Sequence, residues 1–142
     1  MQKLLETSND FKKKINQKDK RGFILDIFVG KPKDHCSLVS FERNSVRGNH
    51  FHKKSIQYSF ILEGKLLMIT SKVSKKGKYI GKRIKKIVKK NDLITHRPFV
   101  AHAFKAKTKS KMLAFADGLR GGKNYEKDTF RLREKLIWNF FI

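Results

Sequence analysis

Hydrophobic positions fall in short runs that are separated by Gly, Asn and Lys. The runs are rich in Phe, Ile and Val, residues that favour the pleated surface of a sheet. Many short strands with little helix predict an antiparallel, all-β sandwich or barrel. Seven runs predict strands: GFILDIFVG, CSLVSFE, IQYSFILEG, KLLMITSKV, DLITH, FVAHAFKA and KMLAFA.

Three further segments carry weaker signals. LEGKLLM predicts a tight hairpin in which Gly64 takes a positive φ. KYIGKRIKKIVKK has helical spacing at Ile80, Ile84, Ile87 and Val88, but Gly81 and the β-branched residues favour a strand. The tail LREKLIWNFFI is compatible with a short helix or a strand, and its aromatic residues are expected to be buried in the core or on a partner.

Composition restricts the class of protein. A chain of 142 residues with 39% apolar residues suits one globular domain. The single cysteine, Cys36, excludes an internal disulfide and is expected to be a small buried hydrophobe in a reducing compartment. No secretion signal or membrane-length apolar run is present, so we expect a cytoplasmic protein without a membrane partner.

The most unusual feature of the composition is the net charge of +23, which results from 35 Lys and Arg against 12 Asp and Glu. Such a charge attracts polyanions, and it has three interpretations. The partner is a nucleic acid, the ligand is a small phosphorylated anion, or the surface is generally rich in lysine without a specific partner. Lysines are spread from Lys3 to Lys135, which favours a solvated surface. Aromatic residues are not interleaved with them as single-strand binding requires, so we expect no nucleic-acid partner.

Two histidines lie one residue apart in VRGNHFHKKSIQYSFILEGKL. In a strand, His50 and His52 point to the same face, and His102 lies in another predicted strand. If the sheet closes on itself, the three imidazoles can meet inside it. Clustered imidazoles either bind divalent transition metals or transfer protons near neutral pH. His96 and His35 have no partner pattern and are expected on the surface or in loops.

The spacing around these histidines resembles the two motifs of the cupin superfamily. The resemblance implies a cupin-type antiparallel jelly roll or β-barrel: a single domain, 1–142, with a core of about 20–131 and an apolar tail, 132–142. It also implies that KYIGKRIKKIVKK is a strand. Phe99 stands where the family usually has glycine. The matching residues are His50, His52, Gln57 and Gly64 in the first motif, and Asn91, Asp92, Pro98 and His102 in the second.

A finer match narrows the expected reaction. RGNHFHKKSIQ resembles a signature of sugar 3,4-ketoisomerases that act on dTDP-4-keto-6-deoxyglucose. KDKRGFILDIF resembles a segment that they share with dTDP-4-dehydrorhamnose 3,5-epimerases. The resemblance implies an isomerase or epimerase of a nucleotide-linked 4-keto-6-deoxy sugar in surface polysaccharide synthesis. It assigns His50 as the base, His52 as its polar partner and Arg47 as a contact of the nucleotide sugar. Gln57, His102 and Lys54 are the further candidates for substrate binding.

The resemblance also bears on cofactors. These ketoisomerases are understood to work without metal, and a glutamine is a poorer metal ligand than the glutamate of many cupins, so we expect no resident metal. If a transition metal is bound, its ligands are expected to be His50, His52, Gln57 and His102. The alternatives are a metal-dependent cupin enzyme of another class and a non-catalytic sugar-binding cupin.

The sequence also bears on the catalytic acid and on the oligomeric state. Epimerisation requires a second acid on the opposite face of the sugar, for which Tyr58, Tyr79 and Tyr125 are the candidates. A homodimer is expected, because the C-terminus is apolar and runs such as IQYSFIL are apolar on both faces.

Overall fold

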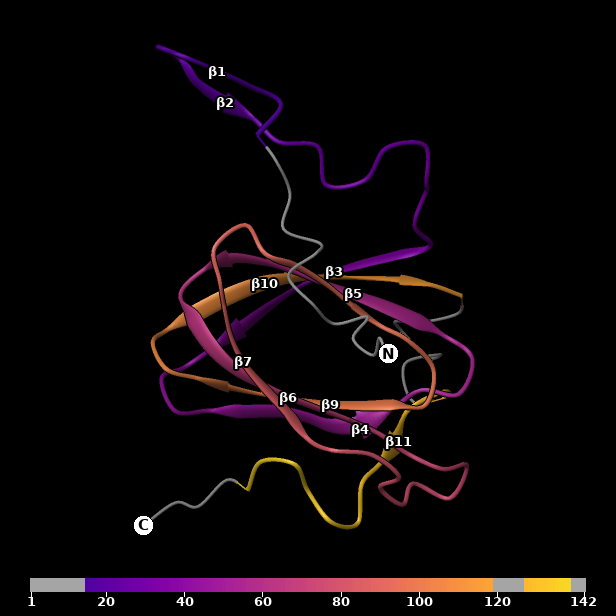
Figure 1. The fold of residues 1–142 in the computed structure, drawn as a ribbon. Coiled ribbons are helices and arrows are strands. Elements are labelled where there is room, and N and C mark those ends of the chain that lie inside the picture. The colour runs from indigo at the N-terminus through magenta and orange to yellow at the C-terminus, as the bar shows by residue number, and fades with distance from the viewer. Residues whose placement is uncertain (1–14, 119–126, 139–142) are drawn as a thin grey trace.

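Two antiparallel sheets face each other and enclose the core (Figure 1). The computed structural model describes residues 15–118 and 127–138, and within them all regular structure is strand. The expected all-β cupin jelly roll is confirmed. One sheet has the order β3 (His35–Phe41), β10 (Ser110–Asp117), β5 (Ile56–Glu63), β8 (Leu93–His96). The other has the order β11 (Phe130–Arg131), β4 (Val46–Phe51), β9 (Val100–Ala106), β6 (Lys65–Lys72), β7 (Ile84–Lys89).

The segment with helical spacing is extended, as expected for a cupin. Strand β7 pairs with β6 along its whole length. The isoleucines do not form one stripe: Ile80 and Ile87 are 65% and 47% exposed, whereas Val88 is buried. The helical spacing was therefore coincidental. Ile84 and Val88 lie on one face of β7, Ile87 lies on the other face, and Ile80 lies in the preceding loop.

The Gly64 turn differs from the expected hairpin. Gly64 has φ +90, as predicted. However, β5 pairs with β10 and β8, and β6 pairs with β9 and β7, so the two flanking strands belong to different sheets. Gly64 thus forms a corner between the sheets. A Cβ there would lie 2.0 Å from Ser110 Oγ, which leaves no space for a side chain.

Alternation along the strands divides the interior into an apolar and a polar end. Side chains that point inward at one end form a hydrophobic cluster that includes Phe104 and Ile61. At the other end the inward positions carry histidines, Gln57 and Ser59. The apolar cluster contains Phe41, Ile61, Leu66, Met68, Val88, Ile94, Phe104, Ala106 and Met112.

A second cluster covers the outer face of the five-stranded sheet. The segment 132–138 runs along this face without forming helix or strand, which corrects the expectation for the tail (Figure 1). Leu132, Leu136 and Ile137 are buried there against Phe51 and its neighbours, whereas Trp138 is 50% exposed. The other aromatic residues of the tail, Phe140 and Phe141, lie with Ile142 outside the described residues.

Asn49 fastens this segment to β4. Its Oδ1 accepts hydrogen bonds from the backbone N–H groups of Leu136 (2.9 Å) and Ile137 (3.0 Å), and its Nδ2 donates to the carbonyl of Ile137 (2.8 Å). The N–H of Leu132 also donates to the carbonyl of Asn49 (2.9 Å), so the side chain and the backbone of Asn49 together satisfy polar backbone groups of a segment that is not a strand.

The N-terminal part differs most from the predictions. GFILDIFVG contributes only β2 (Gly22–Ile24), which pairs with β1 (Gln17–Asp19) in an exposed hairpin that projects from the barrel (Figure 1). Cys36 was expected to be buried but is exposed, because it occupies an outward position of β3. Within the described ranges, no helix is long and apolar enough to cross a membrane.

Candidate functional site: a histidine-lined cavity

A cavity of about 320 Å³ opens at the polar end of the barrel. Four of the predicted site residues line it, namely Arg47, His50, Gln57 and His102. His52 lies behind this wall and is 1% exposed. The remaining lining residues are His35, Ser37, Val39, Phe41, Gly48, Phe104, Met112, Ala114, Phe115, Ala116 and Arg131.

A β-bulge in β4 brings Arg47 and His50 to the same cavity. Gly48 pairs with Ala103 and His50 pairs with His102, so Asn49 is the extra residue on β4. Asn49 has φ +58, and its side chain points to the outer face. Because one residue is inserted, positions 47 and 50 both face inward, which simple alternation would forbid. Gly48 is required at the bulge, since a Cβ there would lie 2.8 Å from the carbonyl oxygen of His102.

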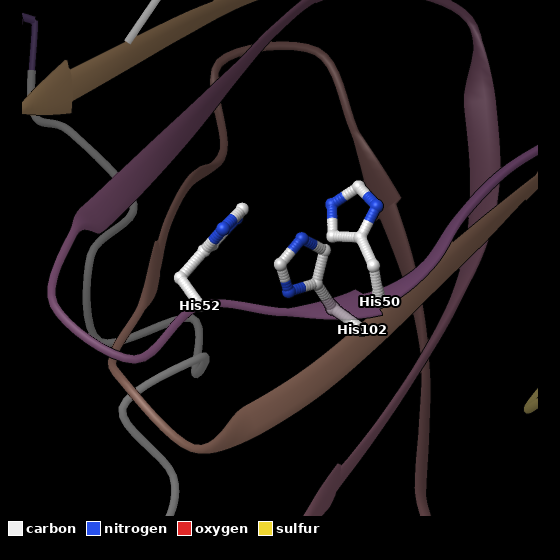
Figure 2. Close-up of side chains that lie close together, drawn as sticks. All are labelled: His50, His52 and His102. Carbon is white, nitrogen blue, oxygen red and sulfur yellow. The ribbon is translucent and has the colours of Figure 1, made fainter. Parts of the chain in front are cut away.

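The three predicted histidines converge, as Figure 2 shows. The ring centroids of His50 and His102 are 4.8 Å apart, those of His50 and His52 5.0 Å, and those of His52 and His102 5.5 Å. One nitrogen from each ring lies within 4.8 Å of the others, and all three residues are buried. The expectation from sequence that a closed barrel gathers these imidazoles is confirmed.

His52 is held by two oxygen atoms. Its Nδ1 lies 2.7 Å from the carbonyl oxygen of Asp128, which can only accept, so Nδ1 carries a proton. Its Nε2 lies 3.2 Å from Oε1 of Gln57, whose amide can turn to offer either a donor or an acceptor. His52 is therefore fixed in orientation, with Nε2 directed to the cavity wall.

Asp128 organises the loop that follows the two histidines. Its carboxylate accepts hydrogen bonds from the backbone N–H groups of Lys53 (2.9 Å), Lys54 (2.9 Å) and Ser55 (2.7 Å). Partial burial acts to raise the pKa of the Asp128 carboxyl, but these hydrogen bonds outweigh it and hold the pKa below its usual value. The same residue thus orders the loop through its side chain and orients His52 through its backbone.

Arg131 is a site residue that the sequence analysis did not identify. In the β11–β4 pairing it stands directly opposite His50, and its Nη1 lies 3.2 Å from Nδ1 of His50. Its neighbours Phe130 and Leu132 both pack in the outer cluster, so alternation turns Arg131 into the barrel. The sequence offered one signal for this position: an arginine between two apolar residues, the pattern of a strand that buries its apolar face and turns the arginine to the opposite face.

His96 was expected on the surface or in a loop, and this was wrong. It lies on β8 with no exposed surface, stacked on His102 with ring centroids 4.2 Å apart. Its Nε2 lies 3.0 Å from Oγ of Ser59. Burial first, and then the nearby His52, lower the pKa of His96 to about 3. His96 is therefore a neutral residue that supports His102 from behind.

Burial has the same effect on His102. It lowers the pKa of this imidazole well below the usual value, and the neighbouring histidines lower it further. Within the described residues, Nε2 of His102 and Nδ1 of His96 have no hydrogen-bond partner. His102 thus presents a neutral ring with an available nitrogen at the histidine cluster.

The other candidate side chains lie elsewhere. Lys54 is exposed on the loop after β4 and does not line the cavity. His35 is half-buried on β3 and does line it, contrary to the expectation of a surface or loop position. Tyr58 donates to Asp117 (3.3 Å) and Tyr79 donates to the carbonyl of Glu134, and neither lines the cavity. Tyr125 lies outside the described residues.

Phe99, at the position where cupins usually have glycine, keeps the backbone that glycine would adopt. Its φ is +62, a conformation that costs a non-glycine residue about 1–2 kcal/mol. Its N–H donates to the carbonyl of His52 (2.8 Å), and its carbonyl accepts from the N–H of Val73 (3.0 Å). These bonds and the packing of its ring in the outer cluster offset the strain and tie the His102 strand to His52.

The number and spacing of the three imidazoles suit a metal ion, but the hydrogen bonds that His50 makes do not. A metal ligand must offer a bare nitrogen, and its other nitrogen usually donates to an oxygen. His52 meets this condition through Asp128, whereas His50 faces a guanidinium that can only donate. The arrangement of His50 therefore does not suit metal binding.

The fold and the cavity define a small double-sheet barrel whose interior carries an inward-facing histidine cluster at one end. The sequence profile of the cupin family matches residues 35–120, and the chain belongs to this family. No curated protein sequence matches the chain.

Several solved structures have the same fold. The dTDP-4-dehydrorhamnose 3,5-epimerase from Sulfolobus tokodaii has a TM-score of 0.66 and 22% identity, covering 80% of this chain and 70% of that one. QdtA, a sugar 3,4-ketoisomerase from Thermoanaerobacterium thermosaccharolyticum solved with TDP, has a TM-score of 0.67 and 19% identity, covering 86% and 85%. The capsular polysaccharide assembling protein CapF from Staphylococcus aureus has a TM-score of 0.59 and 17% identity, covering 84% of this chain and 32% of that one. At these identities the likeness shows the fold.

Proposed function

We propose that the protein is an isomerase or epimerase of a nucleotide-linked 4-keto-6-deoxy sugar, acting by histidine-mediated proton transfer in surface polysaccharide synthesis. The observation that carries the proposal is the position of His50 in the wall of a cavity that Arg47 and Arg131 also line. A histidine that shares a cavity with two arginines suits a substrate that is anionic at its diphosphate and becomes anionic at its reacting oxygen.

The proposed chemistry begins at the carbon beside the ketone. His50 removes the proton from that carbon, and the electron pair moves onto the carbonyl oxygen, giving an enediolate. The positive charge of Arg131, beside His50, stabilises this oxygen. In ketoisomerisation the proton of the neighbouring hydroxyl passes to the former carbonyl oxygen, and the protonated His50 returns its proton to the former carbonyl carbon, so that the hydroxyl-bearing carbon becomes the new ketone.

One observation favours ketoisomerisation over epimerisation. Epimerisation requires an acid on the opposite face of the sugar, and of the described tyrosines neither Tyr58 nor Tyr79 lines the cavity. A crystal structure of a histidine-to-asparagine variant of the ketoisomerase QdtA contains TDP-4-keto-6-deoxyglucose, which makes that nucleotide sugar the first substrate to test.

The test measures deuterium uptake from D₂O into dTDP-4-keto-6-deoxyglucose by NMR. Loss of a general base slows a reaction by roughly 10²- to 10⁴-fold, so His50→Asn should exchange at least about 100-fold more slowly while still binding the nucleotide. Arg47→Ala should weaken binding more than it slows exchange. Arg43→Ala, an exposed arginine on the loop before β4, is the matched control and should behave as wild type. Absence of both exchange and binding in the wild-type protein would refute the proposal.

The expected homodimer is part of this proposal. Exposed apolar side chains support it, namely Phe23 and Ile24 on the β1–β2 hairpin and Leu38 on β3, which are 48%, 55% and 63% exposed. Light scattering at micromolar concentration should give the mass of two chains, and the mass of one chain would contradict this part. The cytoplasmic location and the absence of a nucleic-acid partner remain predictions from the sequence.

A further inference from the structure

We infer that Arg131 is a positioning residue that fixes the tautomer of His50 and thereby keeps the histidine cluster free of metal. The observation behind this inference is the pairing across β11 and β4, in which Nη1 of Arg131 lies 3.2 Å from Nδ1 of His50. The backbone register holds the pair in place, because the two residues are directly opposite each other.

Hydrogen-bond chemistry then fixes the proton on His50. A guanidinium has five N–H donors and no acceptor, so Nδ1 of His50 must be the acceptor. A neutral imidazole has one proton, which consequently lies on Nε2. His52 has the opposite arrangement, since its Nδ1 donates to the carbonyl of Asp128. His50 on β4 and His52 just after it therefore hold opposite tautomers, which are set by two different partners.

This difference decides whether the cluster can hold a metal. His52 and His102 can each offer a bare nitrogen, because Nδ1 of His52 is protonated and Nε2 of His102 has no hydrogen-bond partner within the described residues. His50 cannot, since Arg131 occupies the lone pair of Nδ1 and a proton occupies Nε2. Two imidazoles remain, which is fewer than the three protein ligands of a catalytic zinc site.

The catalytic consequence rests on the proposed function. Nδ1 is the unprotonated nitrogen of His50, so the guanidinium of Arg131 must turn from this nitrogen to the substrate oxygen before His50 can accept the proton. Proton removal and stabilisation of the enediolate would then occur at one point of the cavity. The tautomer and the metal affinity do not depend on any substrate, so they can be tested separately.

The first experiment determines the tautomer of His50 in metal-free wild-type protein. Long-range ¹H–¹⁵N spectra distinguish protonated from bare imidazole nitrogens, and a His50→Gln sample assigns the signals. At about pH 8 we expect a bare Nδ1 and a protonated Nε2 on His50, and the reverse on His52. A protonated Nδ1 on His50 would overturn the inference, and this measurement needs no variant of Arg131.

The second experiment measures affinity for Zn²⁺ and Co²⁺ by calorimetry and Co²⁺ absorption, using protein without an affinity tag. Arg131→Gln should bind these ions about 10- to 100-fold more tightly than wild type, the usual size of an effect from a residue that orients a ligand. The amide of the introduced glutamine can accept a hydrogen bond, which allows Nδ1 of His50 to carry the proton, whereas Arg131→Lys offers only donors and should stay near wild type. Arg47→Gln removes an equal charge from the same cavity, but its Nε donates to the carbonyl of Ser40 (3.1 Å), so it should also stay near wild type.

Two results would overturn the inference here. One is equal metal affinity in wild type and Arg131→Gln. The other is an equal gain in Arg47→Gln, which would mean that the charge of the cavity alone controls metal binding. Neither experiment uses a sugar nucleotide, so a failure of the proposed reaction would leave these results interpretable.

Discussion

The rings of His96 and His102 lie nearly parallel, with centroids 4.2 Å apart and an interplanar angle of 28°. Both residues are fully buried, and burial lowers the pKa of each imidazole, to about 3 for His96 and well below the usual value for His102. In the unfolded chain each titrates near pH 6.5. Below that pH the unfolded state binds protons that the folded state excludes, so the folded state loses stability as the pH falls.

This stack predicts strong acid sensitivity of the metal-free protein. Each buried histidine should lower the free energy of unfolding by about 1.4 kcal/mol per pH unit below about pH 6, so the pair should lower it by about 2.8 kcal/mol per pH unit. His96→Gln removes one titrating group and should halve the part of the slope that comes from the pair. Urea unfolding between pH 4.5 and pH 8 measures the slope. An unchanged slope in the variant would contradict the assignment of His96 as a buried neutral residue.

Asn49→Gly should loosen the C-terminal segment without straining the backbone. Glycine accepts φ +58 freely, so the substitution removes only the side chain and its three hydrogen bonds to Leu136 and Ile137. Buried backbone groups that lose partners predict a loss of about 2–4 kcal/mol. Urea unfolding followed by the fluorescence of Trp138 measures it. The control is Asn44→Gly, which shares the positive φ on an exposed loop and should change stability by less than about 1 kcal/mol.

Gly64→Ala should be among the most damaging single-methyl changes. A Cβ at Gly64 would lie 2.0 Å from Oγ of Ser110 and 2.6 Å from the carbonyl of Lys109, so the corner between the sheets would have to open. We expect a loss of at least about 3 kcal/mol. Gly30→Ala is the control, because Gly30 also has a positive φ but open space around it, and it should cost about 1–2 kcal/mol. Equal thermal shifts in the two variants would show that backbone conformation, not the steric contact, is the cause.

Asp128→Asn should affect stability and the site together. An amide has one acceptor oxygen in place of the two of a carboxylate, so it cannot satisfy the N–H groups of Lys53, Lys54 and Ser55 equally. We expect a loss of about 1–2 kcal/mol in unfolding free energy. The exposed Asp26 is the control, and Asp26→Asn should be neutral within about 0.5 kcal/mol. Unfolding midpoints that match in the two variants would exclude a role for Asp128 in ordering the loop.

Sequence patterns were sufficient for most strands of the two large sheets, although GFILDIFVG forms only β2. They also predicted the convergence of His50, His52 and His102, because alternation gives the face of each side chain and the expected closed barrel brings the strands together. They were insufficient for Arg47, whose inward position depends on the bulge at Asn49. His96 was misassigned because all four residues of β8 are buried, so the strand shows no alternation between core and solvent. Arg131 required knowledge of which strand pairs with β4, and this is a property of the whole fold.

The distance along the chain between partners has a consequence for how the site is assembled. Arg131 and His50 are 81 positions apart, and Asn49 and Ile137 are 88 apart. During synthesis from the N-terminus, β4 is complete long before β11 exists, so His50 cannot acquire its partner until almost the entire chain has been made. Contacts between such distant positions form slowly. A nascent chain that ends before Thr129 has all three histidines but not Arg131, and the last part of this barrel to mature is therefore the part that we expect to perform the chemistry.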